Sequence, residues 1–367
     1  MQGSETMKLK GGDATYRKAW RKICQVSLLL DYQQTYDRLG VTVFQKVLSS
    51  YWEGIPEILK GLEKDGYVQD SSNGCWIQIG GGDPLLAVKS NGDYNNALID
   101  LAALWHYLKK ENAEWIVHMS DNSLIDYTQT IFAAAEHAGW LGECEKQLTH
   151  VGYGLVLGGD KKELAGSSST LLDKAKRVCR EYIDEMEMAA RWTWEEREQI
   201  ADVIGCGAIK YNDLKNDHSA DYMLSLYDIL SNQGDTGVSL QFALACARSV
   251  ISKSGVPMNE LKMISAQDVT IELDAGRKST EGRLLGLQLI KFAEVIQEAV
   301  LAVRPSVLCR YLYDLSLVFR RYYKVQVEAE VKTDSILLLC EATAIVMEKC
   351  FDLLGVQPAR KLERFHD

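Results

Sequence analysis

The sequence predicts an α/β part, built on a partial parallel sheet with a small α+β insertion, followed by an all-α helical bundle. A strand, a helix and a second strand are indicated within residues 115–157, which is the pattern of a parallel βαβ unit. From residue 171 onward the chain is predicted to be almost entirely helical, because its apolar residues recur near the helical period. Only 5 prolines occur among 367 residues, and proline disrupts helix interiors.

The N-terminal part is expected to contain a helix and then a small α+β unit over about 37–95, after a polar tail of residues 1–14. Apolar residues such as Trp20 and Ile23 recur at near-helical spacing. The expected elements are, in order, a helix over 16–36, a strand-like run over 41–44, a helix over 55–65 ended by Gly66, and strands over 76–79 and 85–88.

The parallel part is expected to begin with a helix over 100–108. Residues 115–119 then form a short apolar run between polar neighbours, as in a strand buried inside a parallel sheet. A helix over 127–138 and a strand over 148–157 follow. Because two strands are too few for a stable open sheet, the rest of a nucleotide-binding sheet is expected to be missing or supplied from elsewhere.

The helical bundle is predicted from apolar periodicity and from helix-end signals. Thr193 stands three residues before Glu196, which is the spacing of a capping box, and Gly355 is placed to end the last helix. The expected helices begin at 194 and then cover 208–214, 239–252, 283–302, 306–323 and 335–354. We place the boundary between the two domains after residue 185, giving domains over 15–185 and 186–367.

Charge and cysteine usage exclude several classes of protein. The net charge is −10, with 51 acidic against 41 basic residues, so nucleic acid would have to be bound by a local patch. The 9 cysteines include no C-x-x-C pair, so neither a disulfide scaffold nor a zinc site is expected, and no other metal. No apolar run approaches the roughly 20 residues of a membrane span. We expect an intracellular protein, cytoplasmic or organellar.

Several short segments occur in an order typical of one enzyme family. They are SNG at 90–92, DLAA at 100–103, VGYGLVL at 151–157, GAIKYNDL at 207–214, LCRYLYDL at 308–315, LCEATA at 339–344 and LLGV at 353–356. This ordered set resembles class I arginyl-tRNA synthetases, with similarity from about residue 8 to residue 364. The resemblance implies the second half of a Rossmann-like catalytic domain, then the anticodon-binding helical domain.

The resemblance also shows where this sequence departs from the family's substrate motifs. The His-x-Gly-His motif, which binds ATP phosphates in the family, does not occur. The family's Tyr-Ala-Thr-Thr-Asp corresponds to residues 96–100, where Asp100 is kept and Asn96 stands in place of the tyrosine. Its Asp-x-Gly-Gln-x-x-His corresponds to a segment that begins at Asp121, with Leu124 in place of the glutamine and Tyr127 in place of the histidine.

Asp100 and Asp121 are therefore predicted as a residual substrate pocket, and no catalytic residue is assigned. The family's second signature is a basic loop, which corresponds to residues 159–169 and lacks the basic residue near its C-terminal end. No cofactor is expected, and ATP would be a substrate only if activity is retained.

Positive charge gathers among aromatic residues in the predicted bundle. Arginine suits phosphate contact and tyrosine suits stacking on unpaired bases, so these residues are candidates for tRNA or other structured RNA. The candidates are Arg248, Arg304, Arg310, Arg320, Arg321, Tyr322 and Lys324. The alternative is an ordinary helix, with the aromatic residues in the core and the arginines on a solvated face.

Three functions remain open from the sequence. The leading one is a non-catalytic arginyl-tRNA-synthetase-like protein that binds tRNA or other structured RNA through its helical domain. The second is a structural subunit of a larger assembly, with a protein partner covering the surface that half a domain leaves exposed. The third is arginine–tRNA ligase activity, with this chain a fragment or completed by a second chain.

Overall fold

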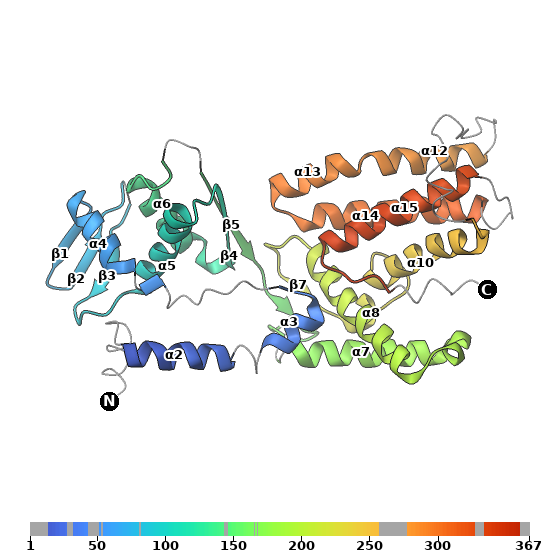
Figure 1. Cartoon of the computed structure of the whole chain (residues 1–367), viewed down its shortest axis with the longest axis horizontal. Coiled ribbons are helices and arrows are strands. Elements are labelled where there is room, and N and C mark those ends of the chain that lie inside the picture. Colours follow the sequence, from blue (N-terminus) through green and yellow to red (C-terminus); the bar gives the residue numbers. More distant parts are fainter. Residues whose placement is uncertain are drawn as a thin grey trace. The chain divides into compact units, whose positions relative to one another are not determined.

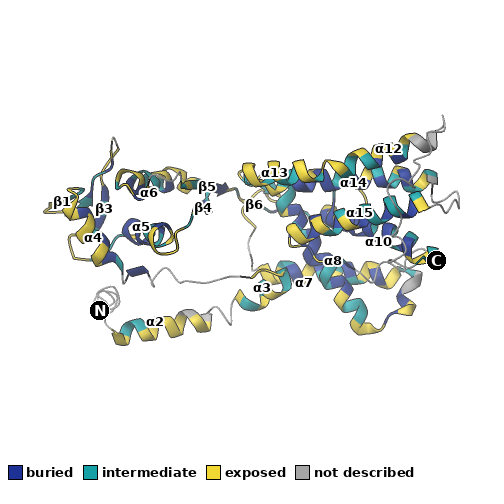
Figure 2. Ribbon diagram, turned by 45° about the horizontal axis from the view of Figure 1, so that its top comes forward, coloured by how far each residue is buried: buried dark blue, intermediate teal, exposed yellow. Residues whose placement is uncertain are grey.

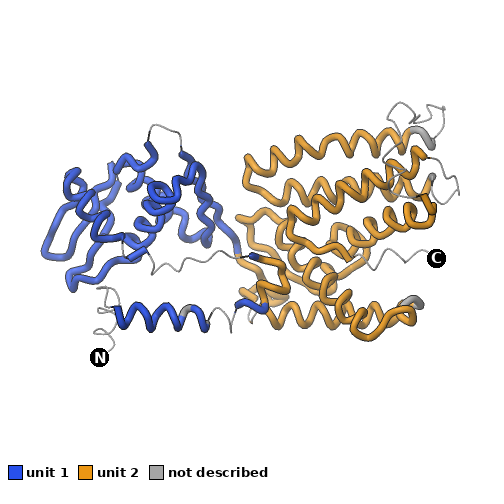
Figure 3. The backbone as a smooth tube through the Cα atoms, in the orientation of Figure 1, with its two compact units in different colours: residues 1–34, 42–154 blue, residues 35–41, 155–367 orange. Residues whose placement is uncertain are grey.

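The described residues form two compact units, one within residues 1–34 and 42–154 and the other within 35–41 and 155–367 (Figure 3). The computed structural model describes residues 14–27, 32–42, 51–52, 54–80, 82–142, 146–164, 166, 168–256, 277–326 and 334–359. The units do not separate after residue 185, where the sequence suggested a boundary. The reason is that α7 (Ser168–Glu185) packs closely against α8 (Trp194–Lys215) inside the second unit.

The first unit contains a three-stranded antiparallel sheet (Figure 1). In the sequence, one helix comes directly before this sheet and another comes directly after it. Its elements are α2 (Ala14–Ser27), α4 (Ile55–Lys64), β1 (Val68–Ser71), β2 (Gly74–Ile77), β3 (Leu85–Lys89) and α5 (Asn96–Trp105). The core is built where Ile58 of α4, Ile77 of β2 and Leu98 of α5 meet. β1 was not predicted, because its sequence VQDS has a single apolar residue and little burial.

The predicted parallel βαβ unit is confirmed. It consists of β4 (Trp115–Asp121), α6 (Ile125–His137) and β5 (Gln147–Tyr153). The two strands pair in parallel along their full length, with Trp115 opposite Gln147 and Asp121 opposite Tyr153. Among the described residues these strands form a sheet of only two. α5 continues for one turn with π-helical hydrogen bonding over His106–Lys110.

The strand expected over 148–157 is interrupted. β5 ends at Tyr153, and β6 (Val156–Leu157) pairs instead with β7 (Tyr222–Met223) in the second unit. The change of partner is fixed by the Leu155 amide, which donates to the Asp221 carboxylate at 2.7 Å. Of the expected strand-like run over 41–44, residues 41 and 42 have no strand structure and the rest lies outside the described residues.

The second unit is helical, and Figure 2 shows its buried residues turned toward the inside of the bundle. Its helices are α3 (Gln33–Leu39), α7, α8, α9 (Leu226–Ile229), α10 (Gly237–Ser254), α12 (Arg277–Ile290), α13 (Phe292–Ala302), α14 (Pro305–Gln326) and α15 (Asp334–Leu353). The largest core cluster includes Tyr211, Leu240, Phe319 and Phe351. The expectation of an α/β part followed by an all-α part is therefore confirmed.

Helix ends follow the sequence signals, while helix lengths differ in two places. The Thr193 hydroxyl accepts from the Glu196 amide at 3.2 Å, and the Glu196 carboxylate accepts from the Thr193 amide at 3.0 Å, so the capping box is confirmed. The two segments expected from 194 to 214 are one helix, α8. The helix expected over 283–302 is split at Lys291 into α12 and α13.

A short early segment belongs to the helical unit although it lies far away in sequence. Arg38 of α3 donates to Asp173 of α7 and to Asp202 of α8, each at 2.7 Å. The Lys210 ammonium of α8 donates to the backbone carbonyls of Leu39 and Gly355. These contacts tie α3 to the bundle. No helix in the described part of the chain combines the length and apolar character needed to cross a membrane.

Candidate functional site

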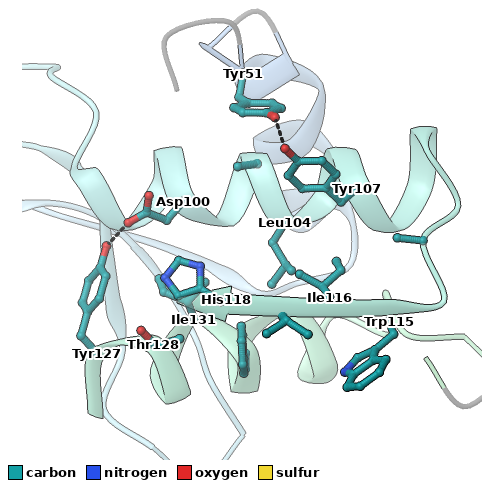
Figure 4. Close-up of a pocket in the computed structure, with 14 residues that line it drawn as sticks. Tyr51, Asp100, Leu104, Tyr107, Trp115, Ile116, His118, Tyr127, Thr128 and Ile131 are labelled. Atoms are coloured by element: carbon teal, nitrogen blue, oxygen red, sulfur yellow. Dashed lines mark hydrogen bonds between the residues drawn. The ribbon is translucent and has the colours of Figure 1, made fainter. Parts of the chain in front are cut away.

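A cleft of about 460 Å³ lies in the first unit, lined by α5, β4 and α6 (Figure 4). Its lining residues are Tyr51, Asp100, Ala103, Leu104, Tyr107, Ala113, Trp115, Ile116, Val117, His118, Tyr127, Thr128, Ile131 and Phe132. Four consecutive residues of β4 contribute, although neighbouring side chains on a strand point to opposite faces. The cleft therefore runs along an edge of β4, and it must be the edge away from β5 because β5 pairs with the other one.

Asp100 lines this cleft and is held by Tyr127. The Tyr127 hydroxyl donates to Oδ2 of Asp100 at 2.5 Å, which links α5 to α6. Burial and then the hydrogen bond to the carboxylate raise the pKa of Tyr127 above its ordinary value, so its proton stays on the hydroxyl. The sequence analysis did not predict that Tyr127, the residue replacing the family's histidine, would bind Asp100.

Asp121 has a different role from Asp100 and does not line the cleft. It ends β4, and its carboxylate accepts a hydrogen bond from the Ser123 amide at 2.8 Å, capping the short helical turn Asn122–Leu124. Hydrogen bonds from Ser123 lower the pKa of Asp121. The two acidic residues expected to share a residual substrate pocket are thus not gathered in one cavity.

The other polar groups of the cleft come from residues that the sequence did not single out. The Tyr51 hydroxyl donates to the Tyr107 hydroxyl at 2.9 Å. Thr128 is only 2% exposed, and its hydroxyl has no hydrogen-bond partner among the described residues. No sequence signal marked them, because Tyr51 is far from the others in sequence and Thr128 lies within an ordinary helical segment.

Two histidines stack beside this cleft on adjacent strands. The parallel register places His118 opposite His150, with ring centroids 6.2 Å apart. Nε2 of His150 lies 2.8 Å from the Ser120 hydroxyl. Desolvation, and then the neighbouring His118, lower the pKa of His150, because a second positive charge would be poorly tolerated there. The lowered pKa favours the neutral form of His150.

The loop that follows β6 is a compact turn. The Gly158 amide donates to the Lys162 carbonyl at 2.8 Å, and the Leu164 amide donates to the Val156 carbonyl at 2.8 Å. Lys161 and Lys162 are exposed at its tip. The described part of this loop therefore folds back on itself and presents its two lysines to solvent.

Four of the seven candidate RNA-binding residues are exposed on the helical unit: Arg304, Arg310, Arg321 and Lys324. Arg310, Arg321 and Lys324 lie on one face of α14, because their spacings of 11 and 3 residues are close to whole turns. We call these three residues the α14 stripe. The nearest carboxylate to Arg321 is that of Glu281, 3.9 Å away.

The other three candidates take part in contacts within the bundle. Tyr322 is 2% exposed and its ring belongs to the bundle core, so it cannot stack on a base. Arg248 donates to Glu341 at 2.7 Å and to Glu348 at 2.6 Å, which ties α10 to α15. Arg320 donates to the Ser239 carbonyl at 2.6 Å and is only partly exposed.

Comparison with known proteins divides the chain between residues 226 and 240, inside the second compact unit. Residues 4–226 match the family described as tRNA synthetases class I (R), catalytic domain, and residues 240–362 match the DALR anticodon binding domain. The chain belongs to the class I arginyl-tRNA synthetase family. The catalytic-domain match covers the first unit and extends through α7 and α8, and the DALR match covers the later helices of the second unit, from α10 onward.

Curated relatives match almost the whole chain. The chain is 41% identical to the chloroplastic/mitochondrial arginine–tRNA ligase of Arabidopsis thaliana, over 97% of this chain and 56% of that protein. It is also 41% identical to the cytoplasmic enzyme of the same plant, over 97% of this chain and 61% of that protein. The human cytoplasmic enzyme is 32% identical over 96% of this chain. The chain thus spans little more than half the length of these relatives.

Solved structures confirm the fold. The arginyl-tRNA synthetase of Plasmodium falciparum superposes with a TM-score of 0.83 at 24% identity, covering 96% of this chain and 60% of that one. The enzyme of Thermus thermophilus superposes with a TM-score of 0.74 at 20% identity, covering 96% and 68%. At this identity the likeness establishes the fold alone.

Proposed function

We propose that this chain takes part in making arginyl-tRNA, as the part of an arginine–tRNA ligase that includes half of the catalytic domain and the anticodon-binding domain. The observation that carries this proposal is the continuous 41% identity to two plant ligases along 97% of the chain. The identity extends through both domains, so it favours the ligase reading over the non-catalytic reading that the sequence first suggested. The substrates would be arginine, ATP and tRNA.

The helical unit would hold the tRNA. The α14 stripe and Arg304 offer four exposed cations in a chain with a net charge of −10. Such cations bind phosphates and release counterions, which makes the affinity depend on salt. The DALR family of this unit supports tRNA as the RNA, and an intracellular location with the other components of translation fits that role.

Asp100 would receive the arginine side chain. A guanidinium is bound best by a carboxylate that accepts two parallel hydrogen bonds. Tyr127 occupies Oδ2 of Asp100, so a guanidinium could take Oδ1 alone unless the Tyr127 hydroxyl turns away. Arginine binding would therefore compete with the link between α5 and α6.

A second candidate function is tRNA binding without catalysis. It is favoured by Leu124, which stands where the family has a glutamine, and by the hydrogen bond that Tyr127 donates to Asp100. In this reading the helical unit docks RNA, and the first unit is covered by a protein partner. The two candidates share the tRNA-binding surface and differ in whether arginine is transferred.

The deciding experiment measures transfer of radiolabelled arginine to purified arginine tRNA in the presence of ATP. The full chain is assayed alone and coexpressed with the part of the Arabidopsis cytoplasmic enzyme that lies outside the matched region. Arginylation in the mixture, above the level of either polypeptide alone, supports the ligase proposal. Salt-dependent binding of tRNA without transfer in any mixture supports the second candidate. The absence of both tRNA binding and transfer overturns both.

A further inference from the structure

We propose that Glu281 is a positioning residue for RNA binding, because its carboxylate accepts a hydrogen bond from Nε of Arg321 when the terminal nitrogens of that guanidinium bind an RNA phosphate. Arg321 belongs to the α14 stripe, and Glu281 lies on the neighbouring helix α12. This inference rests on the proposed binding of tRNA. It deepens that proposal by naming a residue of a second helix that orients one of the phosphate contacts.

The first support is the position of the Glu281 carboxylate. Its Oε2 atom lies 3.9 Å from Nε of Arg321. This oxygen is buried and has no hydrogen-bond partner among the described residues, and the Glu281 side chain as a whole is only 19% exposed. A buried acceptor without a donor is unfavourable. The carboxylate therefore attracts the nearest donor that can move toward it, which is the Arg321 side chain.

The second support is the edge of the guanidinium that faces this carboxylate. The shortest approach is to Nε, while the Arg321 side chain is 61% exposed. A guanidinium has one N–H on Nε and four on its terminal nitrogens. A shift of about 1 Å would bring Nε to the roughly 2.7–2.9 Å of a charge-assisted hydrogen bond. The two terminal nitrogens then remain for a phosphate, which an arginine can bind through two parallel hydrogen bonds.

The third support is that Glu281 stands on a firmly packed helix. Figure 1 shows α12 alongside α14, and the two helices are in contact. Leu285, one turn after Glu281, is completely buried in the core. The Tyr311 hydroxyl of α14 donates to the Gln288 carbonyl of α12 at 3.0 Å. The carboxylate is thus fixed relative to α14, and holding one end of a long side chain reduces the conformational freedom that binding would cost.

Arg321 differs from the other cations of the α14 stripe in having such a partner. Within the described ranges, the contact with Glu281 is the one ion pair that the stripe makes. Arg310 and Lys324 therefore provide an internal comparison, since they would bind phosphate without a carboxylate behind them. The adjacent Arg320 is not equivalent, because it donates to the Ser239 carbonyl.

A competing interpretation is that Glu281 only repels RNA. Like charges near one another are unfavourable, so a carboxylate beside a phosphate-binding arginine would weaken binding. The two interpretations predict opposite signs. If Glu281 positions Arg321, its removal weakens tRNA binding, whereas if Glu281 repels RNA, its removal strengthens binding.

The test is fluorescence anisotropy of the full chain with arginine tRNA across a salt series. Glu281→Ala should weaken binding about threefold and lower the salt slope by about 1, as the loss of one phosphate contact does. Glu281→Gln should bind at least as well as the unsubstituted chain, because its amide oxygen can still accept from Nε. In an Arg321→Gln background, Glu281→Ala should leave the affinity unchanged. Glu294→Ala on α13 is the matched control, since Glu294 is an exposed acid of the same unit.

Arg321→Lys tests the same geometry without altering Glu281. A lysine keeps the charge but has a single nitrogen, which cannot serve the carboxylate and a phosphate in the same way as a guanidinium. Because Arg321 is exposed, this variant should fold normally and should bind tRNA about threefold more weakly. Thermal unfolding of each variant separates lost binding from lost folding.

The inference is overturned if folded Glu281→Ala binds tRNA as tightly as the unsubstituted chain or more tightly, or if Arg321→Lys binds normally. It is also overturned if Glu281→Ala weakens binding equally in the Arg321→Gln background, because the effect would then come from packing. Each of these results leaves the proposed tRNA binding intact. A complete lack of tRNA binding by the unsubstituted chain would overturn both, and arginylation is scored separately.

Discussion

Tyr127 and Asp100 are joined by a 2.5 Å hydrogen bond that connects the first turn of α6 to α5. The pair stands where the family's substrate motifs have a histidine and an aspartate. The tyrosine hydroxyl therefore fastens α5 to α6 through the carboxylate that an arginine substrate would use.

Replacing Tyr127 with phenylalanine should destabilise the first unit and make Asp100 more available. A partly buried hydrogen bond to a charged group contributes about 1–2 kcal/mol, so the free energy of unfolding should fall by about that amount. Urea denaturation measures the change. Tyr153→Phe is the control, because Tyr153 is exposed and should lose almost nothing. Equal stability of the two variants would contradict the structural role of this hydrogen bond.

Replacing Arg248 with leucine should destabilise the helical unit without changing its affinity for tRNA. The substitution leaves Glu341 and Glu348 without their cation, and partly buried carboxylates are costly when unpaired. We expect a loss of about 2–3 kcal/mol, measured by chemical denaturation. Arg310→Leu, on the solvent-exposed face of α14, should leave stability nearly unchanged. A loss of tRNA affinity in a folded Arg248→Leu protein would indicate that Arg248 contacts the tRNA.

Arg310→Gln and Arg321→Gln should each reduce the salt dependence of tRNA binding. Removing one phosphate contact lowers the slope of log affinity against log salt by about 1. Fluorescence anisotropy with arginine tRNA across a salt series measures this slope. Tyr322→Phe should leave the slope unchanged, because that ring is buried. Unchanged slopes in both arginine variants would indicate that tRNA binds at a surface other than α14.

The stability of the first unit should decrease in mild acid because of His150. Its folded pKa lies below the ordinary value of about 6.5, so the unfolded chain binds the proton more readily. Stability is then fully present above about pH 6.5 and is lost as the pH falls toward the folded pKa. His150→Gln keeps a polar group near Ser120. Between pH 8 and 5.5, the melting temperature of this variant should fall by less than that of the unsubstituted protein. His218→Gln in the other unit serves as the control, and an identical pH dependence in all three proteins would contradict the assignment.

Much of the fold could be predicted from local patterns, and the failures have physical causes. The βαβ unit and the Thr193 cap were predictable because they depend on residues close together in sequence. The break after Tyr153 was not, because a residue 66 positions later, Asp221, fixes the Leu155 backbone. The division at Lys291 was missed because apolar periodicity continues across it.

The candidate site was harder to predict, because residue type does not reveal what a side chain contacts in the fold. Asp100 was found through the family motif, whereas the unpartnered Thr128 belongs to no motif. Arg248 and Arg321 look alike in sequence. Arg248 lies between two carboxylates of α15, whereas Arg321 is mostly exposed and has one carboxylate 3.9 Å away, and no short sequence pattern distinguishes the two residues.

Arg38 has a consequence for how the protein is made. It binds Asp173 and Asp202, which follow it by 135 and 164 residues. At synthesis rates of about 5–20 residues per second, Arg38 is synthesised roughly 7–27 seconds before Asp173. The first unit lies between them and can fold during that interval. α3, the first segment of the helical unit, can therefore form its contacts with α7 and α8 only after the first unit has been synthesised.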